Sequence, residues 1–290
     1  MSSPTTLIIG KHAKTGSRVD ALLRAQGHAT RAVSRSTAPA FDWDNPSGWA
    51  QAMAGCRAAY VTFQPDLAVP GARETLARFI ETAKQAGLEH LVLLSGRGEA
   101  GAQQAEQVLM NSGLTWNVVR ASWFDQNFSE GFLIEGVLQG EVALPSGDVP
   151  EPFIDVDDIA EVAVACLTRP ELANTLFEVT GPELLTFQQC VAILAEELQR
   201  PIEFVPISAR QLLQGLEAQG LPEPMQWLMN ELFTVVMDGR NSRLEQGVMQ
   251  ALGRPARSFR DYVRKTAASG VWQAAETSAV VGATAGVQAQ

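Results

Sequence analysis

Short apolar runs alternate with amphipathic segments along residues 1–125. The apolar runs have the length of buried strands, and the segments between them carry apolar residues at helical spacing. The predicted strands are residues 7–9, 28–33, 58–63, 90–94 and 114–120. One predicted helix, 73–85, places on its core face Leu76, Phe79, Ile80 and Ala83. This alternation predicts an α/β fold with a doubly wound parallel sheet of the Rossmann type.

The pattern becomes irregular after Trp123, where a helix is expected over 128–138. One of the aspartates Asp155, Asp157 and Asp158 is expected to cap a helix, with a catalytic acid as the alternative, and Thr186 is expected to cap the helix that follows it. We therefore predict a smaller, mostly helical C-terminal lobe beside the Rossmann core. The expected divisions are a core over 1–125, the remaining sheet elements and the C-terminal lobe over 126–274, and a disordered tail over 275–290.

A glycine turn follows the first predicted strand. The strand ends at Gly10, and a helical pattern that includes Val19 begins shortly afterwards. Gly10 can adopt dihedral angles that other residues avoid, and Gly16 would let the helix lie close to the sheet. Unpaired amides at the start of that helix then make a site for a pyrophosphate. Ala13 departs from the usual three-glycine pattern, and the motif also fits a strand-loop-helix turn without a ligand.

Ser34, Arg35 and Ser36 follow the second predicted strand. At this place in dinucleotide folds, an acidic residue accepts a hydrogen bond from the ribose 2′-hydroxyl, whereas an arginine accommodates a 2′-phosphate. No acid is present here, and a guanidinium binds phosphate through paired hydrogen bonds. The segment therefore favours NADP, with an incidental surface arginine as the alternative.

The composition narrows the class of protein. The chain has 290 residues, 46% of them hydrophobic, and a formal net charge of −10. This charge argues against binding to the phosphate backbone of nucleic acids. The three cysteines are scattered, and neither they nor the histidines have the spacing of metal ligands. With no apolar run long enough to span a bilayer, we expect a cytoplasmic protein without a metal.

Other stretches accompany the glycine turn and the Arg35 segment, among them Phe41-Asp-Trp-Asp-Asn-Pro46 and Asp238-Gly-Arg240-Asn241. Further such stretches are 91–98, 120–130, 153–159 and 180–187. Together they resemble the NmrA-like, atypical short-chain dehydrogenase/reductase family. Within that family the chain is most similar to bacterial relatives of the ergot alkaloid reductases of the festuclavine dehydrogenase type.

The resemblance implies an NADP-binding core with a small-molecule substrate between the core and the C-terminal lobe. A homodimer is compatible with the sequence. The implied cofactor-binding residues are Gly10, Lys11, His12, Ala13, Lys14, Thr15, Gly16, Ser34, Arg35, Ser36, Thr62, Phe63, Ser95, Gly96, Ser122, Trp123 and Phe124. The expected substrate pocket consists of Asn127, Phe128, Met225, Trp227, Met229 and Phe233. A stripe of methionine and aromatic residues is equally compatible with hydrophobic core.

The chain lacks the Tyr-x-x-x-Lys pair with which many short-chain dehydrogenases protonate an alkoxide. Its only tyrosines are Tyr60, in a core strand, and Tyr262, which has Lys265 three residues later near the end of the chain. Hydride addition to an iminium, a quinone or a cationic dye needs no such acid. The catalytic residues are left unassigned, with His12 and Asp125 as candidate proton donors.

These observations predict an NADPH-dependent reductase of an electrophilic, apolar small molecule, which works by positioning alone. The alternative is a non-enzymatic, NADP-binding redox sensor of the NmrA type. The missing tyrosine–lysine pair and Ala13 are compatible with the sensor.

Overall fold

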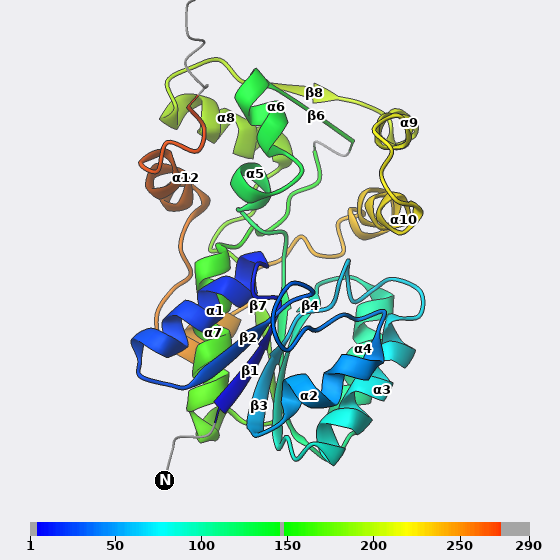
Figure 1. Ribbon diagram of the computed structural model, residues 1–290. Helices are drawn as coiled ribbons and strands as arrows, with labels where there is room; N and C mark the ends of the chain where they lie inside the picture. The colour runs from blue at the N-terminus through cyan, green and yellow to red at the C-terminus, as the bar shows by residue number, and fades with distance from the viewer. Residues whose placement is uncertain (1–4, 146–147, 274–290) are drawn as a thin grey trace, which may run out of the picture.

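A parallel sheet of six strands forms the centre of the lower half of the molecule in Figure 1, in the order β2-β1-β3-β4-β5-β7. The strands are β1 (Thr5–Ile9), β2 (Thr30–Val33), β3 (Cys56–Val61), β4 (His90–Gly96), β5 (Thr115–Ala121) and β7 (Thr175–Val179). The computed structural model describes residues 5–145 and 148–273. The predicted Rossmann sheet is confirmed, whereas the expected tail 275–290 lies outside the described residues.

The strands end together at one edge of the sheet. Ile9 at the end of β1 pairs with Val33 at the end of β2, and Ala121 at the end of β5 pairs with Val179 at the end of β7. All neighbouring strands run parallel, so the segments that follow them emerge at this carboxyl edge. Parallel α/β sheets bind their ligands at this edge.

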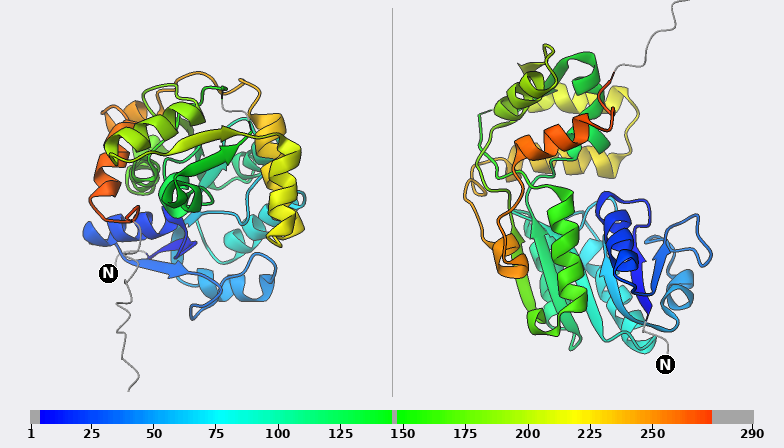
Figure 2. Two further views of the ribbon diagram at one scale, coloured as in Figure 1. Left: turned by 90° about the horizontal axis from the view of Figure 1, so that it is seen from above. Right: turned by 90° about the vertical axis from the view of Figure 1, so that its left-hand side faces the viewer.

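Helices cover both faces of the sheet, as the side and top views in Figure 2 show. One face carries α2 (Trp49–Met53), α3 (Ala72–Gln85) and α4 (Ala100–Met110), and the other carries α1 (Lys14–Ala25), α7 (Val156–Thr168) and α11 (Gly247–Leu252). Leu7 and Ile9 belong to the first core, whereas Ile8 belongs to the second. Side chains alternate across a strand, so one short apolar run supplies both cores. The predicted core face of α3 is confirmed, since its four residues are each at most 2% exposed.

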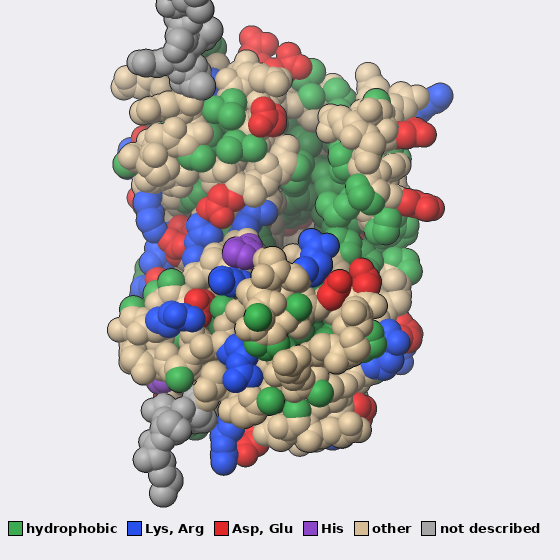
Figure 3. All heavy atoms as spheres, in the orientation of Figure 1, with side chains coloured by type: hydrophobic (Ala, Val, Ile, Leu, Met, Phe, Trp, Pro, Cys, Tyr) green, Lys and Arg blue, Asp and Glu red, His purple; other side chains and the backbone are tan. Residues whose placement is uncertain are grey.

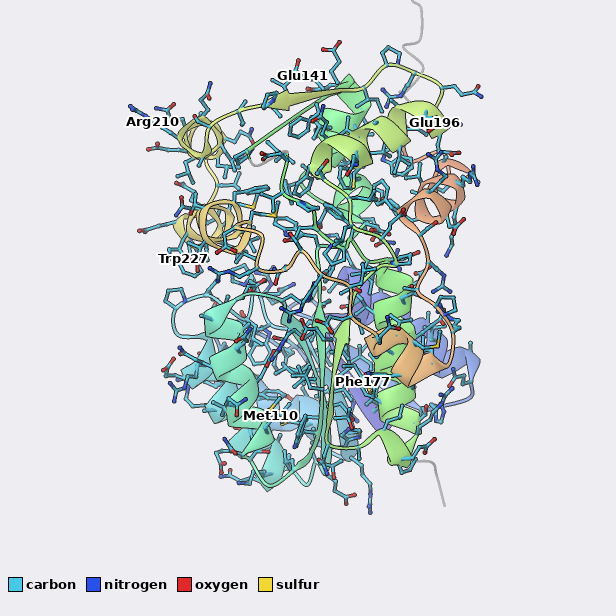
Figure 4. All side chains as sticks on the ribbon, turned by 180° about the vertical axis from the view of Figure 1, so that it is seen from behind. Met110, Glu141, Phe177, Glu196, Arg210 and Trp227 are labelled. Carbon is cyan, nitrogen blue, oxygen red and sulfur yellow. The ribbon has the colours of Figure 1, made fainter. Side chains whose placement is uncertain are left out.

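A smaller lobe sits above the carboxyl edge. It contains α5 (Asn127–Glu130), α6 (Ile134–Gln139), α8 (Phe187–Glu197), α9 (Ala209–Ala218), α10 (Glu223–Glu231), a π-helical turn (Leu232–Val236) and α12 (Phe259–Ala267). A two-stranded parallel sheet, β6 (Glu141–Leu144) and β8 (Glu203–Pro206), lies beside these helices. Figure 4 shows the lobe from behind, with Glu141 and Glu196 on it and Phe177 on β7 below. The expected helical lobe is therefore present.

The helix expected over 128–138 is in fact two short helices, α5 and α6. Gly131 follows α5 with an extended backbone, φ −136° and ψ −163°. A Cβ at Gly131 would lie only 3.0 Å from the Cα of Asn127. The chain turns tightly at this glycine, and the helical pattern of apolar residues did not reveal the break.

The chain passes between core and lobe several times. After β5 it enters the lobe, returns through α7 and β7, and later sends α11 back to the core before α12. The Asp155 carboxylate accepts a hydrogen bond from the N–H of Asp157 at the start of α7, and Thr186 and Gln189 form a capping box on α8. Both predicted caps are confirmed. Two short 3₁₀ turns, Pro46–Gly48 and Pro170–Leu172, complete the described structure.

An ionic cluster fastens α1 to the smaller lobe. The guanidinium of Arg18 on α1 lies 2.6 Å from Glu130 of α5 and 2.7 Å from Asp157 of α7. Lys265 of α12 pairs with the same Asp157. The cluster joins the core to the lobe beside the start of α1. In the part of the chain that the structure describes, no helix combines the length and apolar character needed to cross a membrane.

Candidate functional site

A cavity of about 840 Å³ opens at the carboxyl edge of the sheet, between core and lobe. Figure 3 shows the surface hollowed between the two lobes, with hydrophobic side chains on the upper wall. Its lining residues are Ile9, Gly10, His12, Ala13, Val33, Ser34, Arg35, Ser36, Phe41, Asp42, Trp43, Asp44, Thr62, Gln64, Pro65, Pro222, Pro224 and Met225. The glycine turn, the Arg35 segment and the end of β3 thus meet at one cavity.

The glycine turn brings β1 and α1 into close contact. Gly10 has φ 93°, and a Cβ there would lie 2.6 Å from Oγ1 of Thr62. A Cβ at Gly16 would lie 2.2 Å from the carbonyl oxygen of Gly10. Each position therefore requires glycine, one for its dihedral angles and its neighbour and the other for the approach of the helix to the turn.

The start of α1 has amides free to bind an anion. Ala13 is its N-cap, no side chain caps the helix, and its first turn contains no acidic residue. Four N–H groups at a helix start lack partners within the helix and attract negative charge. Lys14 adds a cation at this position, although burial lowers its pKa. Thr15 and Gly16 are buried behind the turn, and Lys11 and His12 are exposed.

Arg35 projects into the cavity region without a partner. Its side chain is exposed and makes no hydrogen bond or ion pair with the described residues. Arg31, in β2, is different because its guanidinium donates to the carbonyl oxygens of Ala52 and Ala54. The hydroxyls of Ser34 and Ser36 lie 3.1 Å apart beside Arg35. This arrangement can hold an anion that bears several oxygen acceptors.

Phe41 and Trp43, which follow β2, form an aromatic wall of the cavity and were not among the expected site residues. The Trp43 indole N–H donates to the carbonyl oxygen of Thr62 over 3.0 Å, and the Trp43 ring lies 4.6 Å from that of Phe63. Asp42 and Asp44 flank Trp43 and line the same cavity. The signal for this wall in the sequence is the alternation of aromatic and acidic residues after the second strand.

The residues expected beside nicotinamide do not line this cavity. The Ser95 hydroxyl donates to Glu106 over 2.6 Å, and the Ser122 hydroxyl accepts from Arg97 over 3.0 Å. The Trp123 ring contacts Phe187 and Phe233 in the lobe. Gly96 and Phe124 follow the same strand ends but are likewise absent from the lining.

The expected substrate-pocket residues are divided between core and surface. Phe128 is fully buried within the aromatic core of the lobe, so its expected contact with substrate is corrected. Met229 and Phe233 are 4% and 3% exposed and belong to the same core. Asn127 and Trp227 are partly exposed, and Trp227 lies on α10 in Figure 4. Met225 alone of the expected set lines the cavity.

The tyrosines and Asp125 are sealed away from the cavity. Tyr60 is fully buried, and the Tyr262 hydroxyl donates to Ser129 over 2.7 Å inside the lobe. Burial raises the pKa of both phenols. Asp125 is also fully buried, and burial with nearby carboxylates raises its pKa well above the ordinary range. The expectation that Asp125 lies at the cleft is therefore corrected, while His12 does line the cavity.

Buried carboxyl groups near the strand ends were missed from the sequence. Burial raises the pKa of Asp66 and of Glu99, and the negative charge of Asp66 raises the pKa of Glu99 further. Glu151 has no hydrogen-bond partner for either carboxylate oxygen, and burial raises its pKa to about 7. No sequence motif marks these groups, because residues from separate loops create their surroundings.

Comparisons with known proteins assign the chain to a family that binds a nicotinamide cofactor. A family model described as NAD(P)H-binding matches residues 7–170. The chain belongs to the NAD(P)H-binding family. It is 30% identical over 282 residues to agroclavine dehydrogenase of Claviceps fusiformis, an alignment covering 89% of this chain and 96% of the relative.

Two solved structures share the fold of this family member. An NADPH-dependent quinone oxidoreductase of Escherichia coli in complex with NADPH has a TM-score of 0.75 and 16% identity, covering 90% of this chain and 99% of that one. NmrA, a negative transcriptional regulator in complex with NAD, has a TM-score of 0.67 and 15% identity, and the match covers 93% of this chain and 98% of NmrA. The expected kinship with ergot alkaloid reductases is confirmed, and the chain is an NAD(P)H-binding oxidoreductase. The likeness to NmrA extends to the fold.

Proposed function

We propose that this protein is an NADPH-dependent reductase that acts on an electrophilic, apolar small molecule. The observation that carries the proposal is the unpartnered Arg35 guanidinium at the same cavity as the glycine turn. An arginine here suits a 2′-phosphate, whereas NAD sites carry an acid that binds the free 2′-hydroxyl.

The residues present fit the phosphorylated dinucleotide. The N–H groups at the start of α1 would hold the pyrophosphate, and Gly10 leaves the backbone open on that side. Arg35, with the hydroxyls of Ser34 and Ser36, would hold the 2′-phosphate. When bound, the reduced nicotinamide supplies a hydride. The contribution of the chain is to bind, to orient and to exclude water.

The chemistry of the lobe supports an acceptor that is apolar and already electrophilic. Trp123, just after β5, is partly exposed, and Phe132 of the lobe is 44% exposed. The two tyrosines are buried away from the cavity, so neither provides the acid that ketone reduction needs. A quinone or an iminium fits these surroundings, because hydride addition to an iminium gives a neutral amine directly and water can protonate the anion formed from a quinone.

Replacing Arg35 tests the proposal. We expect Arg35→Ala to weaken NADPH binding roughly 10- to 100-fold, the value of one lost charge-assisted contact. Binding of NADH should change by less than about twofold, because NADH has no 2′-phosphate. Titration of both cofactors by fluorescence measures this. The control is Arg57→Ala, since Arg57 pairs with Glu89 near the opposite edge of the sheet. Equal losses for NADPH and NADH would refute the assignment.

The second candidate is a redox sensor that binds the cofactor without turnover. The N-cap of α1 is Ala13, whose methyl group lies at the cavity, and the tyrosines have no access to it. A screen of quinones, cyclic imines and triphenylmethane dyes for NADPH oxidation separates the candidates. Tight cofactor binding with no oxidation by any of these acceptors would favour the sensor.

A further inference from the structure

The tip of the smaller lobe shares the cavity with the glycine turn. Pro222, Pro224 and Met225 line it together with Gly10 and Arg35. These three residues belong to the α9–α10 arm, which we define as α9, the turn 219–222 and α10. In Figures 1 and 4 the arm stands to one side of the lobe, above the α3–α4 side of the core.

The cavity covers one half of the expected dinucleotide site. Its core residues come from the glycine turn, the end of β2, the aromatic wall after β2 and the end of β3. The strand ends of β4 and β5, where nicotinamide is expected, contribute none of the lining residues. The arm tip therefore faces the adenosine and pyrophosphate half. Met225 lies at the cavity formed by the glycine turn and the Arg35 segment, and not at the strand ends where an acceptor is expected.

The tip is stiff and is fixed at its base. Pro222 is the N-cap of α10, Pro224 lies in its first turn, and the side-chain amide of Gln226 donates to the carbonyl oxygen of Leu221 over 2.8 Å. Prolines fix the backbone φ, so little conformational entropy is lost when such a turn contacts a ligand. The tip is therefore preorganised as an apolar surface.

The 238–241 stretch, which follows α10 and the π-helical turn, is in contact with the core. Arg240 donates to the carbonyl oxygen of Gly98 over 3.1 Å, and Arg97 donates to the carbonyl oxygen of Asn241 over the same distance. A Cβ at Gly98 would lie 2.6 Å from the Asn241 amide nitrogen, so the two segments are in close contact. The chain that leaves the arm is thus held against the turn after β4, while the tip of the arm lies at the cavity.

We propose that Pro222, Pro224 and Met225 complete the cofactor site as an apolar roof over the adenosine–pyrophosphate half of NADPH. This rests on the proposed function, because the dinucleotide is the occupant. Apolar side chains and a methionine thioether contact flat ring systems favourably. The polar turn and Arg35 hold the phosphates from one side, and the arm excludes water from the other. Cofactor release then requires the arm tip to move away from the core.

The test measures binding rather than turnover. The probes are NADPH and 2′,5′-ADP, which carries the phosphorylated adenosine half without nicotinamide. We expect Met225→Ala to weaken both ligands roughly tenfold, the order expected when part of a buried apolar side chain loses its contact. Dissociation of NADPH should quicken by a similar factor. Met225→Leu should restore both, because it returns an apolar side chain of similar volume.

Met249→Ala is the matched control, since Met249 is 42% exposed on α11 and does not line the cavity. Thermal unfolding of each variant shows that it is folded. Unchanged affinities for Met225→Ala would overturn the proposal. A loss for NADPH with none for 2′,5′-ADP would also overturn it and would assign Met225 to the nicotinamide or acceptor end.

Different results would refute the proposed function. If the wild-type protein bound neither NADPH nor NADH, the reductase would be refuted and the roof with it. If the wild-type protein bound NADH but not NADPH, only the cofactor preference would fail, and 5′-ADP would replace 2′,5′-ADP as the probe of the arm.

Discussion

The close approach of α1 to the glycine turn predicts that Gly16→Ala destabilises the protein. A Cβ at Gly16 would lie 2.2 Å from the carbonyl oxygen of Gly10 and 3.3 Å from that of Ile9. Both obstacles are backbone atoms, so no side-chain rotation can relieve the contact. To restore an ordinary contact distance, the start of α1 must move away from β1 by about 1 Å.

The magnitude follows from two opposing terms. Forcing an extra methyl group into a tightly packed site costs about 1–3 kcal/mol, and a backbone obstacle at this distance belongs near the upper value. Alanine is more favourable than glycine within a helix by about 1 kcal/mol. We therefore expect Gly16→Ala to lower the free energy of unfolding by about 2 kcal/mol. NADPH binding should also weaken, because the displaced amides no longer converge on the pyrophosphate.

Gly215→Ala is the matched control. Gly215 lies within α9, and a Cβ there would meet no atom within 4 Å. The free energy of unfolding of this variant should rise by about 1 kcal/mol, because alanine favours a helix more than glycine does. Urea denaturation of the cofactor-free proteins measures both values. Equal m-values would show that the same surface area is exposed on unfolding in each protein. If Gly16→Ala were as stable as Gly215→Ala, the close packing of α1 on the turn would be refuted.

Two further predictions concern buried titratable groups. Burial raises the pKa of Glu151 to about 7 from an ordinary value of 4.5, so the native state binds more protons than the unfolded state between these values. The free energy of unfolding should therefore fall by about 3 kcal/mol as the pH rises through this window. In Glu151→Gln this fall should be absent, as measured by urea denaturation at a series of pH values between about pH 5 and pH 8. Identical pH dependence in the two proteins would contradict the assignment. Tyr262→Phe removes the hydrogen bond to Ser129, so it should cost about 1 kcal/mol in thermal unfolding. It should leave acceptor reduction within about twofold, and a loss of 100-fold or more would show a catalytic phenol.

Local features of the sequence predicted much of the core. The alternation of apolar runs and helical segments was enough for the parallel sheet, because burial on both faces requires short, continuous apolar strands. Gly10 and Gly16 predicted the turn, since few other residues tolerate the positive φ of Gly10 or the close backbone contact at Gly16. Asp155 and Thr186 marked helix starts through hydrogen bonds to residues two or three positions away. Each of these signals acts over a few residues.

The sequence by itself thus determined the Rossmann core, the glycine turn and the basic residue at the second strand. Only the tertiary structure decided that Met225 faces the cavity while Phe128 is buried in the lobe core, because both belong to similar apolar helical patterns. It also decided that the pKa of Glu99 is raised by Asp66 as well as by burial, since the two residues come from loops after two different strands. Periodicity fixes which face of a helix is apolar. The neighbours of that face depend on how distant segments pack, and no local pattern encodes this.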